Sequence, residues 1–289
     1  MARHLVCLTF DFDVVSSWIF RGLTTPTQIS RGEFGLIGAE RILTLLERRG
    51  IPSTWFIPGH TIDNYPSACK RVHAAGHEVG HHGYLHEPPA TLGTREAEDA
   101  VLLKGNESIQ RLTGRPAVGY RSPSWDLSEH TVDLLLERGF SYDSSMMAND
   151  HHPYFARRGD VFVADRPVVE GPTTSLVEVP VSWTLDDFPH FEYRRFDNQL
   201  QEGLRRAGDV LDNFVDDFRY LKQIEDWGVL TYTFHPQVIG RGHRMLMLER
   251  LIDSLESEDA VFVRMAEAVE EFRSRSRAGG SKAAGRDPA

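Results

Sequence analysis

The stretch Leu5-Val6-Cys7-Leu8-Thr9-Phe10-Asp11-Phe12-Asp13 is apolar over most of its length and then places two carboxylates two positions apart. A short apolar run of this kind favours a buried β-strand. Side chains two positions apart on a strand point to the same face, so Asp11 and Asp13 are expected side by side. Two carboxylates at a buried edge repel each other unless one is neutralised, and a metal ion would do so. An ordinary polar turn after the strand is the alternative, since Asp is common in turns.

Outward from this stretch, short apolar runs alternate with helical patterns along most of the chain. Further strands are predicted at residues 53–57, 78–80, 117–120, 141–143, 176–181, 229–234 and 260–263. Helices are predicted at residues 37–49, 65–75, 94–113, 128–138, 197–227, 244–257 and 265–275. This alternation predicts a parallel sheet covered by helices, as an open sheet or as a closed barrel. Because no Gly-x-Gly-x-x-Gly motif follows the first strand, we favour an irregular α/β barrel.

The length and composition of the chain suit a single large core. It has 289 residues, of which 40% are hydrophobic, and α/β barrels of this size are single domains. We expect one barrel domain over residues 1–273 and a disordered tail over residues 274–289, which are rich in Arg, Ser, Gly and Ala. Residues 146–180 break the strand–helix rhythm and are expected to form an extended loop with short strands.

The charge and the apolar runs exclude several classes of partner. The formal net charge of -10 argues against nucleic acid or an anionic membrane surface as the main partner. The two cysteines provide neither a disulfide framework nor a zinc-ribbon spacing. The first apolar run ends in aspartates rather than in a cleavage site, and no stretch reaches the roughly 20 apolar residues of a membrane span. We therefore expect a soluble cytoplasmic protein.

Polar side chains with catalytic potential follow five of the predicted strands. In an α/β barrel the active site forms where the strands end at their C-terminal edge, so these side chains are expected at one rim. They are Asp11 and Asp13 after the first strand, His81, His82 and His86 after the third, Arg121 after the fourth, Trp183, Asp186 and Asp187 after the sixth, and His235 after the seventh.

The histidines are sorted by their position rather than by their spacing. Thirteen histidines make a chance His-x-x-x-His pair unsurprising. His82 and His86 lie just beyond a strand, where one helical turn would put both on one face. With one aspartate they form a set of two imidazoles and a carboxylate that zinc and other first-row divalent metals accept. Surface histidines in a loop are the alternative. Arg121, if partly buried, needs a carboxylate, and Asp11 is the natural partner.

Taken together, these segments resemble the polysaccharide deacetylase family, carbohydrate esterase family four. The matching segments are residues 9–13 (TFDFD), 76–87 (GHEVGHHGYLHE), 120–125 (YRSPSW), 143–147 (DSSMM), 180–189 (PVSWTLDDFP) and 234–241 (FHPQVIGR). The resemblance implies a distorted (β/α)7 barrel that hydrolyses an amide, usually an N-acetyl group on an amino sugar. The family's first motif usually has two adjacent aspartates followed by Gly-Pro. Here Phe12 separates them, which is similar to a subgroup with peptidoglycan deacetylase, cyclic imide hydrolases and metal-independent allantoinases.

The resemblance also implies a role for each site residue. Asp13, His82 and His86 would hold a divalent metal, with zinc the first choice because imidazole and carboxylate ligands suit it. Asp11 would be the general base held by Arg121, and His235 the general acid. The remaining implied positions are Asp186 or Asp187 to orient His235, Trp183 and Phe188 to line the pocket, and a backbone N–H near Tyr84 or Ser124 to bind the oxyanion.

Three functions are compatible with these residues. The first is a metal-dependent deacetylase or related linear amidase, and the second is a hydrolase of small cyclic amides such as imides or hydantoin-like rings. The third, a degenerate barrel that only binds sugar, predicts losses among the key polar positions, yet all of them hold chemically competent residues. The subgroup also implies a homotetramer, and the aromatic residues between Trp183 and Tyr193 favour a small-molecule or amino-sugar substrate over a polymer.

Overall fold

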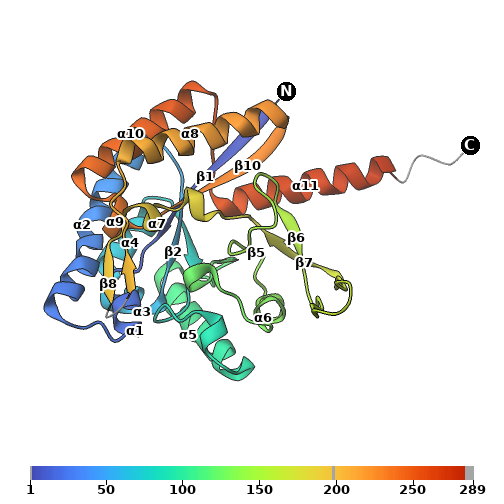
Figure 1. Cartoon of the computed structure of the whole chain (residues 1–289), viewed down its shortest axis with the longest axis horizontal. Coiled ribbons are helices and arrows are strands. Elements are labelled where there is room, and N and C mark those ends of the chain that lie inside the picture. Colours follow the sequence, from blue (N-terminus) through green and yellow to red (C-terminus); the bar gives the residue numbers. More distant parts are fainter. Residues whose placement is uncertain (1, 197–198, 284–289) are drawn as a thin grey trace, which may run out of the picture.

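The computed structural model describes residues 2–196 and 199–283 and shows a curled sheet surrounded by helices (Figure 1). The sheet has the strand order β10-β1-β2-β3-β4-β5-β7-β6, with β11 beside β1. The strands are β1 (Arg3–Asp11), β2 (Thr54–Ile57), β3 (Glu78–His81), β4 (Gly119–Tyr120), β5 (Tyr142–Asp143), β6 (Tyr154–Arg157), β7 (Thr173–Glu178), β10 (Trp227–Phe234) and β11 (Val261–Phe262). This is the distorted barrel that the sequence predicts.

Every strand pair from β10 to β7 is parallel, and only the edge strand β6 runs antiparallel to its neighbour. The side of the barrel between β7 and β10 is closed by irregular contacts. The N–H of Val229 donates to the carbonyl of His151 at 2.8 Å, and Asp186 forms an isolated parallel bridge with Thr233. The carboxyl ends of the parallel strands therefore meet at one rim. This is the rim at which the polar side chains that follow the strands were expected.

Helices cover the outside of the sheet. Their bounds are α1 (Ser16–Phe20), α2 (Pro26–Arg49), α3 (Gly59–Asn64), α4 (Pro66–Ala74), α5 (Arg95–Thr113), α6 (Thr131–Glu137), α7 (Asp187–Phe191), α8 (Ala207–Ile224), α9 (Pro236–Ile239), α10 (Gly242–Ser257) and α11 (Met265–Ala283). The signals at their ends are simple. Gly50 and Gly114 adopt the left-handed conformation that ends α2 and α5, and the Thr94 hydroxyl accepts the N–H of Ala97 at 3.2 Å.

Three expectations for the helices differ from the structure. α2 begins at Pro26 rather than at 37. The helix expected over 197–227 is only α8, because Gln199–Gln201 forms strand β9 against β8 (Arg194–Phe196), while 197–198 lie outside the described residues. The expected disordered tail is helical through Ala283, and 284–289 are not described. The first turns of α11 pack Met265, Ala268 and Val269 into an apolar cluster of the barrel. Tertiary packing of this kind stabilises a helix, and the composition of the tail alone does not reveal it.

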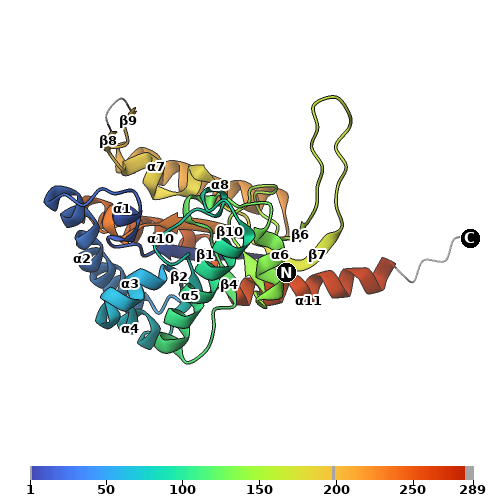
Figure 2. The same ribbon diagram turned by 90° about the horizontal axis from the view of Figure 1, so that it is seen from below.

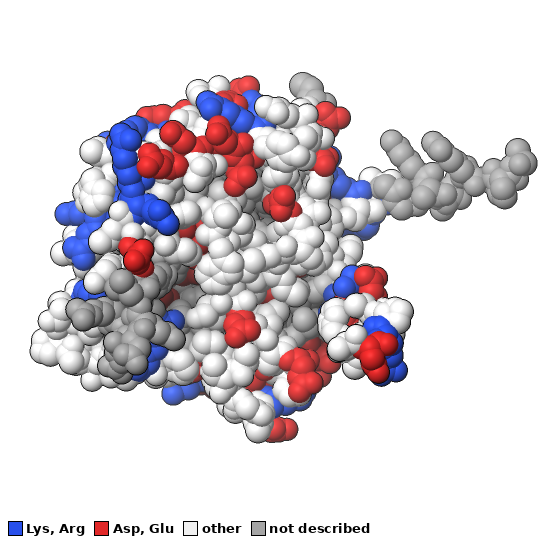
Figure 3. Space-filling model, viewed as in Figure 1, with Lys and Arg blue, Asp and Glu red and all other residues white. Residues whose placement is uncertain are grey.

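Two elements project from the barrel (Figure 2). One is the hairpin of β6 and β7, whose long connection carries an isolated bridge between Val161 and Val169. This matches the extended segment with short strands expected for residues 146–180. The other is the far end of α11. Elsewhere the face seen in Figure 3 carries acidic and basic side chains around an uncharged central area.

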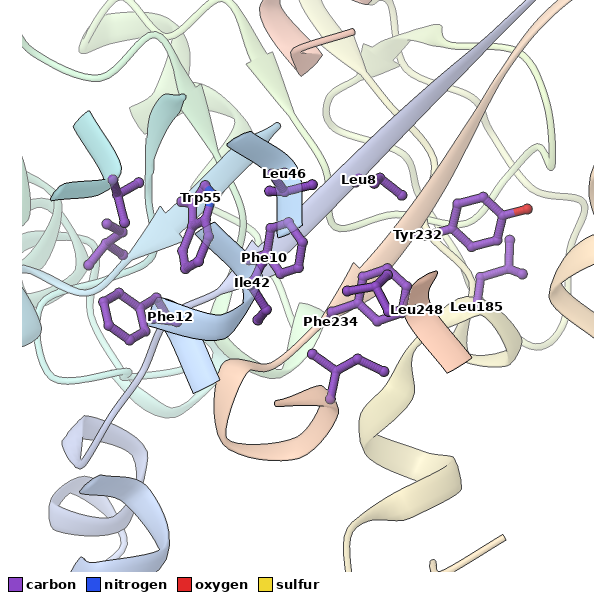
Figure 4. Close-up of a cluster of buried hydrophobic side chains, with 14 of the residues drawn as sticks. Leu8, Phe10, Phe12, Ile42, Leu46, Trp55, Leu185, Tyr232, Phe234 and Leu248 are labelled. Atoms are coloured by element: carbon purple, nitrogen blue, oxygen red, sulfur yellow. The ribbon is translucent and has the colours of Figure 1, made fainter. Parts of the chain in front are cut away.

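The core has two layers because β1 alternates between two apolar surroundings. Leu8, Phe10 and Phe12 face the covering helices and pack with Ile42 and Leu248 (Figure 4). The intervening residues face the inside of the barrel, where Leu5 and Cys7 pack with Tyr142, Val229 and Met265. Each buried side chain of this size contributes roughly 1.5–3 kcal/mol to folding. The same alternation carries Asp11 to the inner face at the rim.

Candidate active site

Four strands bring five of the predicted polar side chains to the rim of the barrel. Asp11 is the last residue of β1, and Asp13 follows two positions later. His82 follows β3, Arg121 follows β4 and His235 follows β10. All five side chains are buried, and Arg121 has no exposed surface. Parallel strands that end at one edge can place polar groups together without exposing the apolar core, because only the strand ends leave the packed interior.

Hydrogen bonds from all three guanidinium nitrogens fix the position of Arg121. Its Nη1 donates to Asp11 Oδ1 at 2.9 Å and to Thr9 Oγ1 at 2.8 Å. Its Nε and Nη2 donate to the carbonyl and the hydroxyl of Ser144 at 3.1 and 3.0 Å. Burial by itself raises the pKa of Asp11, but Arg121, His82 and His235 outweigh burial and lower that pKa. The geometry therefore keeps Asp11 ionised, as the sequence predicted for an Asp11–Arg121 pair.

Asp13, His82 and His86 converge without touching. His82 Nε2 lies 3.6 Å from Asp13 Oδ1 and 3.8 Å from Asp11 Oδ2, and His86 Nε2 lies 3.6 Å from Asp13 Oδ2. These distances exceed a normal hydrogen bond. The opposite nitrogen of His82, Nδ1, lies 2.8 Å from the carbonyl of Arg121. We assign the proton of His82 to Nδ1 on this contact, which leaves the lone pair of Nε2 facing the carboxylates.

This set fits a divalent cation. Asp13 Oδ1 is buried and has no hydrogen-bond partner among the described residues. Burial raises the pKa of Asp13 to about 6, while burial, His82 and Arg21 hold the pKa of His86 well below its usual value. A buried carboxylate without a donor is costly, and a cation between it and two neutral imidazoles removes that cost. The hydrogen bond behind His82 is the kind of support that metal-binding histidines have.

His235 forms a dyad with Asp187. Its Nδ1 lies 2.8 Å from Asp187 Oδ1, and its backbone N–H also donates to that carboxylate at 3.0 and 3.1 Å. Asp186 is farther from Nδ1, at 3.4 Å, and accepts the N–H of Phe188 at the start of α7. Burial alone would lower the pKa of His235, but Asp186 and Asp187 raise it well above its usual value. His235 can therefore carry a proton into the cavity, where its Nε2 lies 4.0 Å from Asp11 Oδ2.

A cavity of about 260 Å³ opens over these groups. Trp183 and Phe188, the two side chains expected in its wall, line it, and so does Ser124, one of the two positions expected to bind the oxyanion. Trp125 also lines it and stacks on Trp183, with ring centroids 4.2 Å apart. The role of Trp125 in the wall, like those of Ser17, Arg21 and Pro189, was not predicted, because nothing in their sequence spacing marks a pocket wall.

The structure places Tyr84 away from the cavity, where a residue that binds the oxyanion was expected. Its N–H, one of two candidates for binding the oxyanion, donates to Glu87 Oε2 at 3.0 Å. Its ring lies under the ammonium of Lys104, with Nζ 3.6 Å from the centroid, and it is absent from the cavity wall. The carboxylate of Glu87, three residues later, accepts that N–H, so the N–H is not free to bind an oxyanion.

The backbone around the cavity is unusual. Four residues other than glycine have a positive φ there: Val14 (51°), His86 (67°), Ser124 (59°) and Trp125 (53°). Such conformations are costly for side chains with a Cβ and persist where the surroundings impose them. Their concentration beside the convergent Asp and His side chains supports a functional site at this rim.

A Helicobacter pylori protein named peptidoglycan deacetylase is 37% identical to this chain over 95% of the chain and 98% of that protein. The chain belongs to the polysaccharide deacetylase family. The family profile of that description matches residues 37–142. A crystal structure from Mycobacterium smegmatis that carries the polysaccharide deacetylase name is 30% identical, with a TM-score of 0.80 over 95% of this chain and 92% of that one. An allantoinase structure, 22% identical with a TM-score of 0.77 over 94% and 91%, shares the fold.

The deacetylases of this family are metal-dependent hydrolases of amide C–N bonds, and this chain is a hydrolase of that type. It retains a group of Asp and His side chains, Asp13, His82 and His86, that could hold the metal. Among residues 2–196 and 199–283, no helix is both long enough and apolar enough to cross a membrane.

Proposed function

We propose that this polysaccharide deacetylase hydrolyses a small amide, with Asp13, His82 and His86 holding one divalent ion and zinc as that ion. The observation that carries the proposal is the buried, unpartnered Oδ1 of Asp13 opposite two imidazole nitrogens. Imidazole and carboxylate ligands suit zinc. Such an ion supplies Lewis acidity, which makes water a better nucleophile near neutral pH and polarises a carbonyl.

The protein's own groups then move the protons. Asp11, kept ionised by Arg121, accepts a proton from the attacking water. His235, supported by Asp187, donates a proton from Nε2 to the leaving nitrogen as the C–N bond breaks. Ser124 lines the cavity and is the remaining candidate for binding the oxyanion through its backbone. Each acid or base contributes ~10²–10⁴-fold to the rate.

The size and walls of the cavity support a monomeric substrate. Trp125, Trp183 and Phe188 wall a space of about 260 Å³, which is small among ligand sites. An N-acetyl amino sugar and a cyclic amide such as an imide both suit it. The fold shared with an allantoinase favours keeping the cyclic amide as the second candidate.

The test is a panel of amides with zinc-loaded enzyme. We expect kcat/KM for N-acetylglucosamine or for a succinimide-like ring to exceed that for a chitin pentamer, and about one zinc per chain by elemental analysis. A clear preference for the pentamer would return the enzyme to the polymer deacetylases. A protein without bound metal that remains fully active would refute the metal assignment.

We further propose that the enzyme is a homotetramer assembled through the β6–β7 hairpin. The tip of that hairpin exposes Phe162 (69%), Val168 (54%) and Val169 (58%) away from the barrel, and apolar side chains on a projecting arm gain from being covered. Light scattering of the 32.7 kDa chain should give about four subunits. Phe162→Ser should lower that mass and Tyr220→Ser, exposed on α8, should not. A mass near one subunit for the unaltered protein contradicts the assembly.

The cytoplasm is the compartment we propose. The two cysteines, Cys7 and Cys69, are free and buried, in keeping with a reducing compartment. Cell fractionation that places the enzyme outside the cytoplasmic membrane would contradict this location.

A further inference from the structure

One wall of the active-site cavity holds a cation that the proposed chemistry does not use. Arg21 follows α1, the short helix that comes after the Asp11–Asp13 segment, and it lines the cavity together with Asp13 and His86. In the described part of the chain, no carboxylate oxygen lies within 4.0 Å of its guanidinium. Other arginines of the chain have such partners, for example Arg121 with Asp11. Arg21 therefore lines the cavity without an ion-pair partner among the described residues.

Arg21 combines an exposed position with partial enclosure of its guanidinium by the protein. The residue is exposed at the mouth of the cavity, yet enough protein surrounds the guanidinium for burial to lower its pKa. Asp13 acts in the opposite sense on that pKa. In the proposed site the charge of Asp13 would be compensated by the divalent ion that it holds. An arginine stays charged at any physiological pH and is suited to bidentate contacts with carboxylates.

The attraction for an anion is local rather than a property of the whole surface. The chain has a formal net charge of -10, and the face in Figure 3 mixes acidic and basic side chains. The opposite wall of the cavity is aromatic, from Trp125, Trp183 and Phe188. The cavity thus has one cationic corner beside the metal ligands and one apolar wall, which would orient a molecule that has both characters.

We propose that Arg21 binds a carboxylate of the substrate, so that the preferred substrate is an acidic amide. This inference rests on the proposed function for the position of the reacting amide, and it adds the substrate class. The carboxylate could be a substituent of an N-acyl amino sugar or of a cyclic amide. In either case Arg21 acts in binding and selects the acidic member of each pair of substrates.

Two pairs of substrates that differ by one carboxylate test this selection. The pairs are N-acetylmuramic acid with N-acetylglucosamine, and hydantoin-5-acetate with hydantoin. We expect zinc-loaded enzyme to prefer the acidic member of the productive pair. In Arg21→Gln the ratio of kcat/KM for acidic over neutral substrate should fall about 10- to 100-fold, the range for losing a hydrogen bond to a charged group. Most of the change should be in KM, and Arg21→Lys should keep part of the preference.

Calorimetry gives a readout that does not depend on turnover. The unaltered protein should bind N-acetylmuramic acid or hydantoin-5-acetate at least about 10-fold more tightly than Arg21→Gln does. The control is Arg71→Gln, an exposed arginine on α4, which should bind like the unaltered protein. Equal affinities of the unaltered protein and Arg21→Gln for both acids, or a preference for the neutral substrates, overturn the role of Arg21. Absence of turnover with normal Arg21-dependent binding would instead count against the proposed reaction.

Discussion

Two of the pairs of buried carboxyl groups in the described part of this barrel differ in the groups that surround them. Asp11 and Asp13 end β1 at the rim of the cavity, whereas Asp143 and Glu178 face each other across β5 and β7. Burial raises the pKa of a carboxyl group in both places. At the rim, Arg121 and the imidazoles oppose that effect and lower the pKa of Asp11. In the second pair, each carboxyl has the other as its neighbour.

The surroundings of the second pair favour the protonated form. Asp143 Oδ1 accepts the Ser145 hydroxyl at 2.7 Å, and Glu178 Oε1 accepts the N–H groups of Ser145 and Met146 at 2.8 Å. The other oxygen of each is buried without a partner outside the pair among the described residues. Burial and, after it, the charge of Asp143 raise the pKa of Glu178 well above its usual value, and burial raises the pKa of Asp143 to about 6, so the pair favours holding a proton. A buried carboxyl group beside cations, such as Asp11, is thus kept ionised and can act as a base. A buried carboxyl group beside another carboxyl, such as Glu178, favours the neutral form and serves the structure.

The largest expected effect comes from removing a ligand at the rim. His82→Ala should lose the bound metal and with it the activity, because one imidazole and one carboxylate remain to hold the ion. Elemental analysis and amide hydrolysis measure both. His73→Ala, an exposed histidine on α4, is the control and should keep its metal. Full metal occupancy in His82→Ala would sink the ligand assignment.

The next effect separates the two aspartates of the rim pair. Asp11→Asn should keep the metal and lower kcat/KM by at least ~10²-fold, the low end for loss of a general base. Asp216→Asn, exposed on α8, should leave kcat/KM unchanged. If Asp11→Asn loses the metal and Asp13→Asn keeps it, the two roles are exchanged.

A smaller effect is expected for the acid, and it should depend on the substrate. His235→Ala should retain the metal and lower turnover by ~10²-fold or more on an N-acetyl sugar. The loss should be milder on an imide, whose leaving nitrogen is already acidic. His243→Ala, exposed on α10, is the matched control. An equal loss on both substrates would argue that His235 acts in binding rather than as an acid.

The smallest effect concerns the pair that favours the protonated form. Glu178→Gln keeps an oxygen that can accept the two N–H groups, and its amide can donate where a protonated Glu178 would donate. The free energy of unfolding of this variant should therefore differ by less than about 1 kcal/mol from that of the unaltered protein. The pH dependence should differ more clearly. Because the folded state raises the pKa of Glu178 above 4.5, it binds more protons than the unfolded state above that pH, and stability falls as the pH rises.

Urea denaturation at pH 5 and pH 7 measures this slope. The unaltered protein should lose stability between these values relative to Glu178→Gln, in which position 178 no longer titrates. Glu107→Gln on the exposed face of α5 should follow the unaltered protein. A stability difference between Glu178→Gln and the unaltered protein that stays constant with pH would mean that the pair does not hold a proton.

Much of the fold followed from local patterns. The predicted strands over residues 5–10, 229–234 and 260–263 overlap β1, β10 and β11, because buried strands are runs of apolar residues that need no distant information. The short strand β9 was assigned to a helix and β8 was not predicted, because three-residue strands carry too few side chains to show a period of two. The start of α2 at Pro26 was also missed, since Gly32, Gly35 and Gly38 on its buried face weaken the apolar pattern there.

What the sequence determined by itself was which chemical groups come to the rim, because a residue that follows a parallel strand lies at the carboxyl edge of the sheet. Asp11, Asp13, His82, Arg121 and His235 are placed by that rule. His81, whose Nε2 lies 3.1 Å from the carbonyl of Leu102 on α5, shows that this placement does not by itself direct a side chain into the cavity. Only the tertiary structure decided which groups touch. Asp187 rather than Asp186 meets His235 most closely, and Glu87 accepts the N–H of Tyr84. Arg21 lines the cavity with no carboxylate of the described residues within ion-pair distance. Contacts of a few ångströms depend on how separate elements pack, and spacing along one chain carries no record of that distance.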